Sequence, residues 1–283
     1  MKLPFNVDLT DKVCVVTGGT GILCGAMADA LAECGAKVAV LGLGQDICDE
    51  KAKSINDKGG KTIGIHANVL DKESLKAAHE IILDKFGPVD ILINGAGGNH
   101  PKGTTTKEYL EPEDLDNEDL ITFFDLDQSG VEFVFNLNFL GTLLPSQEFS
   151  KDMINKEGAT IINISSMNAF TPLTKIPAYS GAKAAVSNFT QWLAVHMSKV
   201  GIRVNAIAPG FFVTDQNRKL LFNEDGTPTA RSEKILNSTP MGRYGEADEL
   251  LGTLLYLVSN DASGFVNGIV IPVDGAFSAY SGV

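Results

Sequence analysis

Residues 13–36, VCVVTGGTGILCGAMADALAECGA, set the fold of this chain. Val13 to Thr17 form a short apolar run suited to a buried strand, and the residues leading up to Gly35 have helical spacing. The glycine-rich turn TGGTGILCG between them lets backbone N–H groups and a helix N-terminus approach a pyrophosphate. This order is typical of the first unit of a dinucleotide-binding βαβ fold, although an ordinary tight turn can have the same sequence pattern.

The rest of the protein alternates in the same way. The patterns predict strands near 13–17, 37–43, 62–67, 89–93, 159–165, 202–207 and 269–273, and helices near 22–34, 46–58, 71–86, 130–155, 177–200 and 246–259. Such alternation implies right-handed crossovers and a parallel sheet covered on both faces. We therefore predict a single α/β domain over residues 1–283, a three-layer Rossmann-type doubly wound parallel sheet of about seven strands.

Composition narrows the functional class. The chain has 283 residues and a net charge of −12, which argues against nucleic acid or an anionic membrane as partner. No apolar stretch is long enough to span a bilayer, and MKLPFNVDLT is not a signal peptide, so the cytoplasm is the expected compartment. The cysteines and histidines lack metal-ligand spacing, so no metal site is expected; the cysteines are Cys14, Cys24, Cys34 and Cys48.

Three polar residues form the candidate catalytic group. Tyr179 and Lys183 stand four residues apart in AYSGAKAAVSNF, so they share a helix face, and Ser166 lies thirteen positions before Tyr179. A positive charge beside a phenol favours the phenolate, so Lys183 is expected to lower the pKa of Tyr179. The group suits proton transfer to a hydroxyl or carbonyl that exchanges a hydride with a cofactor. Tyr and Lys at this spacing also occur by chance on many helices.

Three further motifs follow in order: Asn94-Gly95-Ala96-Gly97, N-F-L-G from Asn138, and Pro209-Gly210. Together with the trio, they make the protein resemble the short-chain dehydrogenase/reductase family from about residue 10 to about 276. The resemblance implies that Tyr179 is the general acid in reduction, that Lys183 tunes it, that Ser166 holds the reacting oxygen, and that Asn138 orders a water. It also implies a set of cofactor-binding residues: Gly18, Gly19, Gly21, Ile22, Leu23, Asn68, Val69, Asn94, Ala96, Gly97, Tyr179, Lys183, Pro209, Gly210 and Thr214. A structural alternative for Asn94 and Asn138 is that they satisfy loop backbone.

The sequence departs from the family pattern at two places. Ile22 and Cys24 stand where the family has its second and third loop glycines. Gly42 stands where NAD-preferring relatives carry an acidic residue, and the basic residue of NADP-preferring relatives is also missing. The absence of that positive charge favours NAD without excluding NADP, and leaves Gln45 or Asp46 as candidate ribose ligands.

Candidate substrate residues cluster after three of these motifs. An insertion over 98–130 starts with Asn99, His100 and Lys102 and continues with nine carboxylates between Glu108 and Asp127, which we expect to form a solvated acidic lid helix. Its His and Lys can bind an anionic substrate group, although His100-Pro101 is also a simple turn signal. The other candidates are Asn168 and Lys175 after Ser166, and Arg218 in a predicted mobile substrate loop over 211–241.

The runs LINGAGGNHPK, NLNFLGTLLPSQ, ISSMNAFTPLTKIPAYS and IAPGFFVTDQNR are similar to a narrower subgroup of the family, the D-mannonate oxidoreductases, or fructuronate reductases. That similarity implies reversible NAD-linked reduction of D-fructuronate to D-mannonate, a small sugar acid. One alternative is a dehydrogenase of another sugar acid or polyol, such as a keto-gluconate reductase. An alternative of another class is a dinucleotide-sensing protein without turnover. The family resemblance also implies a homotetramer.

Overall fold

The computed structural model describes residues 6–214 and 217–282. In this part of the protein, seven parallel strands form one sheet in the order β3-β2-β1-β4-β5-β6-β7. The strands are β1 (Val13–Thr17), β2 (Lys37–Gly42), β3 (Lys61–His66), β4 (Ile91–Asn94), β5 (Thr160–Ile164), β6 (Arg203–Pro209) and β7 (Val270–Val273). The predicted doubly wound parallel sheet is confirmed, and each predicted strand lies within a few residues of an observed one.

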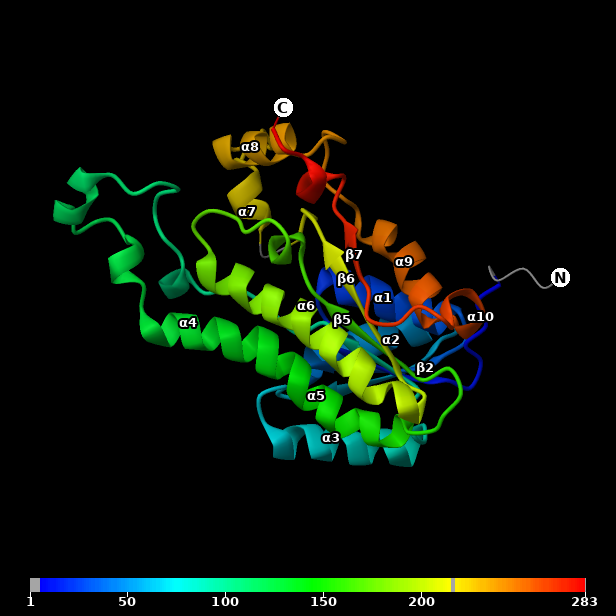
Figure 1. Ribbon diagram of the computed structural model, residues 1–283. Helices are drawn as coiled ribbons and strands as arrows, with labels where there is room; N and C mark the ends of the chain where they lie inside the picture. The colour runs from blue at the N-terminus through cyan, green and yellow to red at the C-terminus, as the bar shows by residue number, and fades with distance from the viewer. Residues whose placement is uncertain (1–5, 215–216, 283) are drawn as a thin grey trace.

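Helices cover both faces of the sheet and make three layers (Figure 1). One outer layer holds α1 (Ile22–Glu33), α2 (Gln45–Asn56) and α9 (Leu251–Val258), and the other holds α3 (Lys72–Lys85), α4 (Gln128–Phe135), α5 (Gly141–Phe149) and α6 (Pro177–Met197). The short helices α7 (Arg218–Leu221), α8 (Ala230–Ser238) and α10 (Asn260–Ser263) lie nearer the C-terminus.

Strand alternation divides the core in two. Val16, paired with Ile93, faces the layer of α1 and packs with Met27 and Leu31, all fully buried. The neighbouring residues along the same strands face the layer of α3, α5 and α6, where Leu92 packs with Phe149. The central strands β1, β2, β4, β5 and β6 thus bury both faces, which explains their largely apolar sequences, whereas the edge strands β3 and β7 are only partly buried.

The connections reverse direction across the sheet between β1 and β4. From β1 the sheet continues to β2 and β3 on one side, whereas β4 to β7 follow on the other. The chain therefore leaves β1 and β4 towards opposite faces of the sheet, which creates a crevice at their carboxyl ends, where ligands bind in open α/β sheets.

Two segments differ from their predicted secondary structure. The prediction of an acidic lid helix within 98–130 is wrong, because the described residues form 3₁₀ turns at Pro101–Gly103, Pro112–Asp116 and Phe123–Asp125 before α4 begins. The carboxylates cap their own backbone, as when Asp114 accepts from the Glu111 N–H, and such local bonds compete with a helix. The segment 211–241, expected to be a loop, contains α7 and α8, and its residues 215–216 lie outside the described residues.

Candidate active site

The loops after β1 and β4 are locked together at the crevice. Thr17 ends β1, and its hydroxyl accepts hydrogen bonds from the N–H groups of Gly95 (3.0 Å) and Ala96 (3.2 Å). Gly18 has φ +64°, and a Cβ there would lie 3.0 Å from the backbone of Ala96, so the turn needs glycine. Helix α1 starts after Gly21 without a side-chain cap, which leaves its first N–H groups open to an anion.

Cys24 explains one departure of the glycine loop from the family pattern. Its thiol is buried and packs over Gly95, where an added Cβ would lie 2.1 Å from the Cys24 Sγ. Burial raises the pKa of this thiol to about 11, so at neutral pH it is an uncharged packing group. The sulfur therefore fills the space above Gly95, and the contact keeps its glycine in the loop after β4.

Replacing Gly95 with Ala is expected to destabilise the protein by about 1–3 kcal/mol, because the new methyl group overlaps the sulfur. Urea unfolding and NADH titration would both report the change, since the same loop borders the crevice. Adding Cys24→Gly should restore most of the loss. Gly252→Ala, at a helical position of α9 with nothing within 4 Å of the added Cβ, is the control and should not destabilise. Equal losses for Gly95→Ala with and without Cys24→Gly would contradict this packing.

Few side chains at the end of β2 are free to form a hydrogen bond with the ribose hydroxyls of an adenosine. An added Cβ on Gly42 would lie 3.0 Å from the Cys48 Sγ, so the position is closely packed. The Gln45 amide donates to Asp49 (2.9 Å) and to the Gly64 carbonyl (3.1 Å), so its side chain is already engaged. Asp46 is exposed in the first turn of α2 and stays the better placed of the two candidate ribose ligands.

The other predicted adenosine-side residues make local contacts. The Asn68 side-chain Oδ1 accepts a hydrogen bond from the Leu70 N–H (3.0 Å). Val69 is buried, 3.0 Å from the position of a Cβ on Gly141. Asn94 is 1% exposed, and its amide donates to Ser146 (2.9 Å) and Asn163 (2.8 Å) under the sheet edge. The side chain of Asn94 therefore braces β4 against β5 and α5.

Asn138 lies where the long helix changes its pitch. Asn136–Leu140 form a π-helical turn between α4 and α5, a feature that often occurs at functional sites. The fully buried Asn138 amide donates to the carbonyls of Gly98 (2.7 Å) and Val134 (2.8 Å) and accepts from the Gly98 N–H (3.3 Å). It thereby fixes the loop after β4 beside Lys183, since a Cβ on Gly97 would lie 2.7 Å from the Asn138 Oδ1 and 3.2 Å from the Lys183 Nζ.

The structure brings Ser166, Tyr179 and Lys183 together. Ser166 follows β5 as the N-cap of a 3₁₀ turn, and Tyr179 and Lys183 lie in the first two turns of α6. The Ser166 hydroxyl forms a hydrogen bond with the Tyr179 phenol. The Lys183 Nζ lies 5.7 Å from the centroid of the Tyr179 ring and donates to the Ile164 carbonyl at 2.8 Å.

Burial shifts the pKa values of both Tyr179 and Lys183. The pKa of Tyr179 lies above its ordinary value because burial outweighs the opposing hydrogen bond from Ser166. This differs from the expectation that Lys183 lowers it. Burial also lowers the pKa of Lys183 to about 8. At neutral pH the pair is thus a neutral phenol beside an ammonium, which is the protonation state that a proton donor needs.

The residues that end β6 complete the same edge. Pro209 is the buried last residue of β6, and a Cβ on Gly210 would lie 2.5 Å from the Asp274 Cα, so the backbone there passes close to the C-terminal segment. The Thr214 N–H donates to the Asn217 side chain at 2.8 Å, at the start of the 211–241 segment. The glycine loop, Asn94–Gly97, Ser166 and Pro209–Gly210 therefore follow adjacent strands, as predicted.

The candidate substrate residues near Gly98 are mostly engaged with their own loop. The Asn99 amide donates to Thr104 (3.0 Å), and the His100 ring packs on Phe133 (5.1 Å between centroids). Lys102 lies 3.7 Å from Asp127. Their polar contacts therefore organise the base of the insertion.

Asn168 and Lys175 are differently placed. Asn168 is 4% exposed, yet its Oδ1 has no hydrogen-bond partner in the described structure, two residues from Ser166. Lys175 has φ +71°, an uncommon backbone state that often marks functional sites, and its carbonyl accepts from the Thr105 N–H (2.8 Å). Arg218 is exposed on α7.

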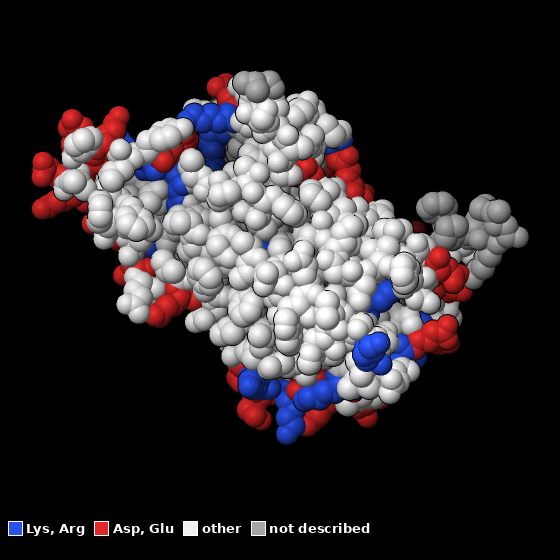
Figure 2. All heavy atoms as spheres, viewed as in Figure 1, with Lys and Arg blue, Asp and Glu red and all other residues white. Residues whose placement is uncertain are grey.

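A charged cluster at the mouth was missed by sequence reasoning. Glu108, in the insertion, pairs with Lys234 of α8 through both carboxylate oxygens, at 3.0 and 3.1 Å. Lys175 and Arg231 also lie close enough to help lower the pKa of Glu108. Figure 2 shows Lys and Arg side chains gathered between α8 and the insertion, whose tip is acidic. Only the fold could single out Glu108 among the nine carboxylates of residues 108–127.

The described residues hold neither a metal cluster nor a membrane-spanning helix. In the ranges 6–214 and 217–282, no group of three or more His, Cys, Asp or Glu side chains is arranged to hold a metal ion. Among the helices of the same ranges, none is long and apolar enough to cross a membrane.

Known proteins match this chain over nearly its whole length. The model of the short chain dehydrogenase family matches residues 12–225. A crystal structure of a Haemophilus influenzae protein with bound NAD, provisionally named a D-mannonate oxidoreductase, is 60% identical, has a TM-score of 0.94, and covers 98% of this chain and 99% of that one.

Two curated relatives extend the comparison. The uncharacterized oxidoreductase UxuB of Bacillus subtilis is 51% identical over 281 residues, which are 99% of this chain and 100% of the relative. A 2-dehydro-3-deoxy-D-gluconate 5-dehydrogenase of Formosa agariphila is 32% identical over 281 residues, 98% of this chain and 97% of the relative.

Proposed function

Because this chain belongs to the short-chain dehydrogenase family, as its motifs predicted, we propose one reaction for it: the reversible NAD-linked reduction of D-fructuronate to D-mannonate. Members of the family are oxidoreductases that act on alcohol groups, and this protein is one of them. The observation that supports the choice of substrate is the cluster of Lys175, Arg231 and Lys234 around Glu108, three cations to one carboxylate, in a protein whose net charge is −12. Such a cluster suits a carboxylate substrate.

The crevice fits a dinucleotide. Gly18 and Gly21 keep the backbone free of Cβ atoms where α1 begins, and the uncapped N-terminus of α1 would hold the pyrophosphate through the N–H groups of Ile22 and Leu23. NAD is favoured because no basic side chain follows β2 at Leu43, and because a relative at 60% identity was solved with NAD bound. When bound, the nicotinamide cofactor supplies the hydride to the keto carbon.

The protein's own residues handle the oxygen and the proton. Ser166 would hold the keto oxygen against Tyr179, whose neutral phenol gives that oxygen a proton as the carbonyl becomes a hydroxyl. The ammonium of Lys183 would stabilise the phenolate that remains. Asn138 would keep the loop after β4 in place and order a water that returns a proton towards Lys183.

Asn168, Lys175 and Arg218 are the residues that we assign to binding the substrate. Asn168, with its unpartnered buried oxygen, would accept a hydrogen bond from a substrate hydroxyl, since an unsatisfied buried oxygen is costly unless a ligand pairs it. Lys175 would bind the carboxylate, and Arg218 on α7 would be a second candidate for it. An anionic, hydroxylated ligand therefore meets complementary groups at both ends.

Replacing Lys175 with Asn is expected to raise the KM for D-fructuronate about 10–100-fold, the loss of one hydrogen bond to a charged group. Asn suits this position because it tolerates a positive φ. The KM for an uncharged hydroxyketone should not change, and neither should kcat. The same rise in KM for both substrates would mean that Lys175 shapes the loop and does not bind a carboxylate.

The substrate itself is tested by following NADH and NADPH oxidation with D-fructuronate beside keto-gluconates and simple ketones. Fast turnover with D-fructuronate and NADH is expected. The keto-gluconates form the main rival, because a relative at 32% identity is named for a dehydrogenase of that class. Turnover of apolar ketones alone would reject a sugar acid, and NADH binding without turnover of any substrate would favour a dinucleotide sensor.

A further inference from the structure

An ion pair ties the insertion to α8. We define the arm as residues 105–127, which project from the body ahead of α4 (Figure 1). Near its base, Glu108 binds the Lys234 ammonium through both carboxylate oxygens, at 3.0 and 3.1 Å. The side chain of Glu108 is 29% exposed and that of Lys234 is 68% exposed. Because water screens a pair so exposed, a competing anion can break it at little cost.

Backbone contacts order the base of the arm independently of this ion pair. The Thr105 N–H donates to the Lys175 carbonyl at 2.8 Å, and the Thr106 N–H donates to the Ile121 carbonyl at 2.8 Å. The Ile121 N–H in turn donates to the Thr106 hydroxyl at 2.9 Å. These bonds keep Glu108, two residues further along, close to Lys175 whether or not the ion pair is made.

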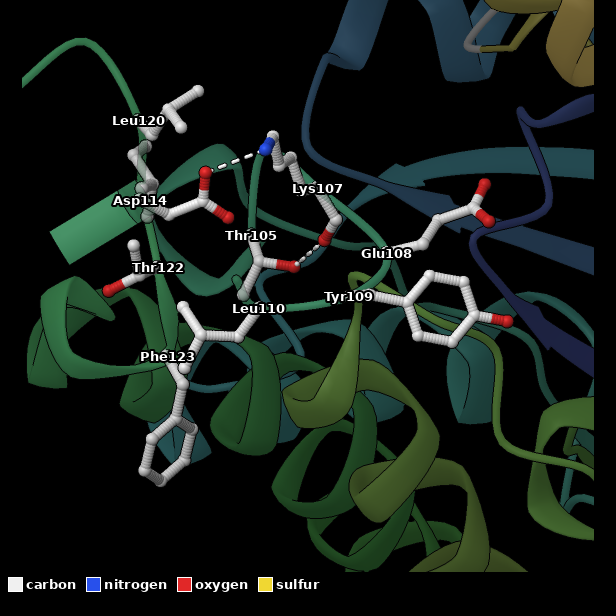
Figure 3. A pocket seen from close by; sticks show the side chains of 10 residues that line it. Thr105, Lys107, Glu108, Tyr109, Leu110, Asp114, Leu120, Thr122 and Phe123 are labelled. Carbon is white, nitrogen blue, oxygen red and sulfur yellow. Dashed lines mark hydrogen bonds and ion pairs between the residues drawn. The ribbon is translucent and has the colours of Figure 1, made fainter. Parts of the chain in front are cut away.

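Glu108 points away from the charged groups of its own segment. Its neighbour Lys107 binds Asp114 at 2.6 Å and Glu111 at 2.9 Å, so these three charges are paired within the arm. In Figure 3 the side chains of Lys107 and Glu108 extend in opposite directions, Lys107 towards Asp114 and Glu108 out of this group. The Glu108 carboxylate is therefore directed to cations of other segments.

Three cations lie around this one carboxylate. The hydrogen bond from Lys234 lowers the pKa of Glu108, and the nearby charges of Lys175 and Arg231 lower it further. Among the residues that the structure describes, neither Lys175 nor Arg231 has an ion pair of its own. The cluster therefore has positive charge to spare for a second carboxylate, and Lys175 lies only four residues before Tyr179.

We propose that Glu108 is a built-in competitor of the substrate: it pairs with Lys234 between turnovers, and the carboxylate of the sugar acid displaces it. This inference rests on the proposed function, because only a substrate with a carboxylate can take over the bond to Lys234. A ligand without that group binds and leaves the ion pair intact. After reduction, Glu108 is still held beside the cluster, so it competes for Lys234 again and assists release of the hydroxy acid.

The kinetic test is Glu108→Gln, which keeps the size of the side chain and removes its charge. Without the competing carboxylate, the KM for D-fructuronate is expected to fall about 2–5-fold, the range that breaking an exposed ion pair supports. The KM for an uncharged hydroxyketone should not change. Glu113→Gln removes the same charge from an exposed residue of the Pro112–Asp116 turn and should leave both KM values unchanged.

The same substitution in a Lys234→Met background separates displacement from charge repulsion. Removing a negative charge near the cluster helps any anion to bind, whether or not Glu108 holds Lys234. Displacement requires Lys234, so Glu108→Gln should lower the KM for D-fructuronate in the wild-type background and have little effect beside Lys234→Met. An equal fall in both backgrounds, or no fall in the wild-type background, would overturn the proposal.

A zero-length carbodiimide reagent measures the ion pair itself, because it joins a carboxylate to a lysine in contact with it. With NAD alone, a link between Glu108 and Lys234 is expected, and its yield should fall several-fold when D-mannonate is added. D-Mannitol, the matching polyol without a carboxylate, should leave the yield unchanged, and the link between Lys107 and Asp114 is the internal reference for reagent activity. If the wild type reduces D-fructuronate but the Glu108 link persists with D-mannonate, displacement is wrong and the proposed function stands. If the wild type reduces no sugar acid, both are rejected.

Discussion

Tyr179→Phe is expected to lower kcat for reduction by about 10³-fold and to change NADH affinity far less, because it removes the proton donor and keeps the ring in place. The phenol is neutral at physiological pH, since burial raises its pKa, and so it can donate in the reductive direction without prior protonation. Steady-state reduction of D-fructuronate and fluorescence titration of NADH measure the two quantities separately.

Tyr256→Phe provides the matched control for this change. Tyr256 lies on α9, 38% exposed and near Arg203 at the start of β6, the strand end opposite to the edge that holds Ser166, so its hydroxyl should be dispensable. Retention of more than about a tenth of the wild-type kcat in Tyr179→Phe would show that the proton comes from another group. In the oxidative direction the phenol must lose its proton first, so the wild-type rate of oxidation should rise with pH.

Lys183→Met is expected to abolish most turnover and yet to stabilise the fold. Lys183 is 3% exposed, and burial lowers its pKa from 10.5 to about 8, so the folded state holds its charge at a cost. At about 1.4 kcal/mol for each tenfold change in proton affinity, the cost is about 3.5 kcal/mol. The variant also loses the hydrogen bond from the charged ammonium to the Ile164 carbonyl, worth about 1.5–3 kcal/mol, so a net gain of about 1 kcal/mol in the free energy of unfolding is expected at pH 7.

The stability that Lys183→Met gains over the wild type should decrease as the pH rises. Below pH 8 both states of the wild type hold the proton, and the cost is fully present. Between pH 8 and 10.5 the unfolded state binds more protons than the folded state, so the wild type gains stability with rising pH and the difference from Lys183→Met shrinks. Urea unfolding at pH 7 and pH 9.5 measures this. Lys183→Arg, which keeps a charge, should show no gain, and a variant less stable than wild type at pH 7 would contradict the assigned cost.

The strands and the catalytic group could be predicted from residue patterns alone. Short continuous runs of apolar residues, such as Val13–Thr17, indicated the strands and their order along the chain, because a strand buried on both faces must be apolar throughout. The spacing of Tyr179 and Lys183 placed both on one helix face, and the carboxyl ends of parallel strands brought Ser166 to them. These features follow from local geometry and the handedness of crossovers, which residue patterns encode directly.

Contacts between distant segments required the folded structure. It placed the Cys24 thiol over Gly95, engaged Gln45 with β3, and joined Glu108 to Lys234 across 126 positions of sequence. It also set the pKa of Tyr179, because burial and the distance to Lys183 depend on packing and not on spacing along a helix. The turns of the arm likewise depend on side chains that bond their own backbone, a choice between local hydrogen bonds that charge patterning does not reveal.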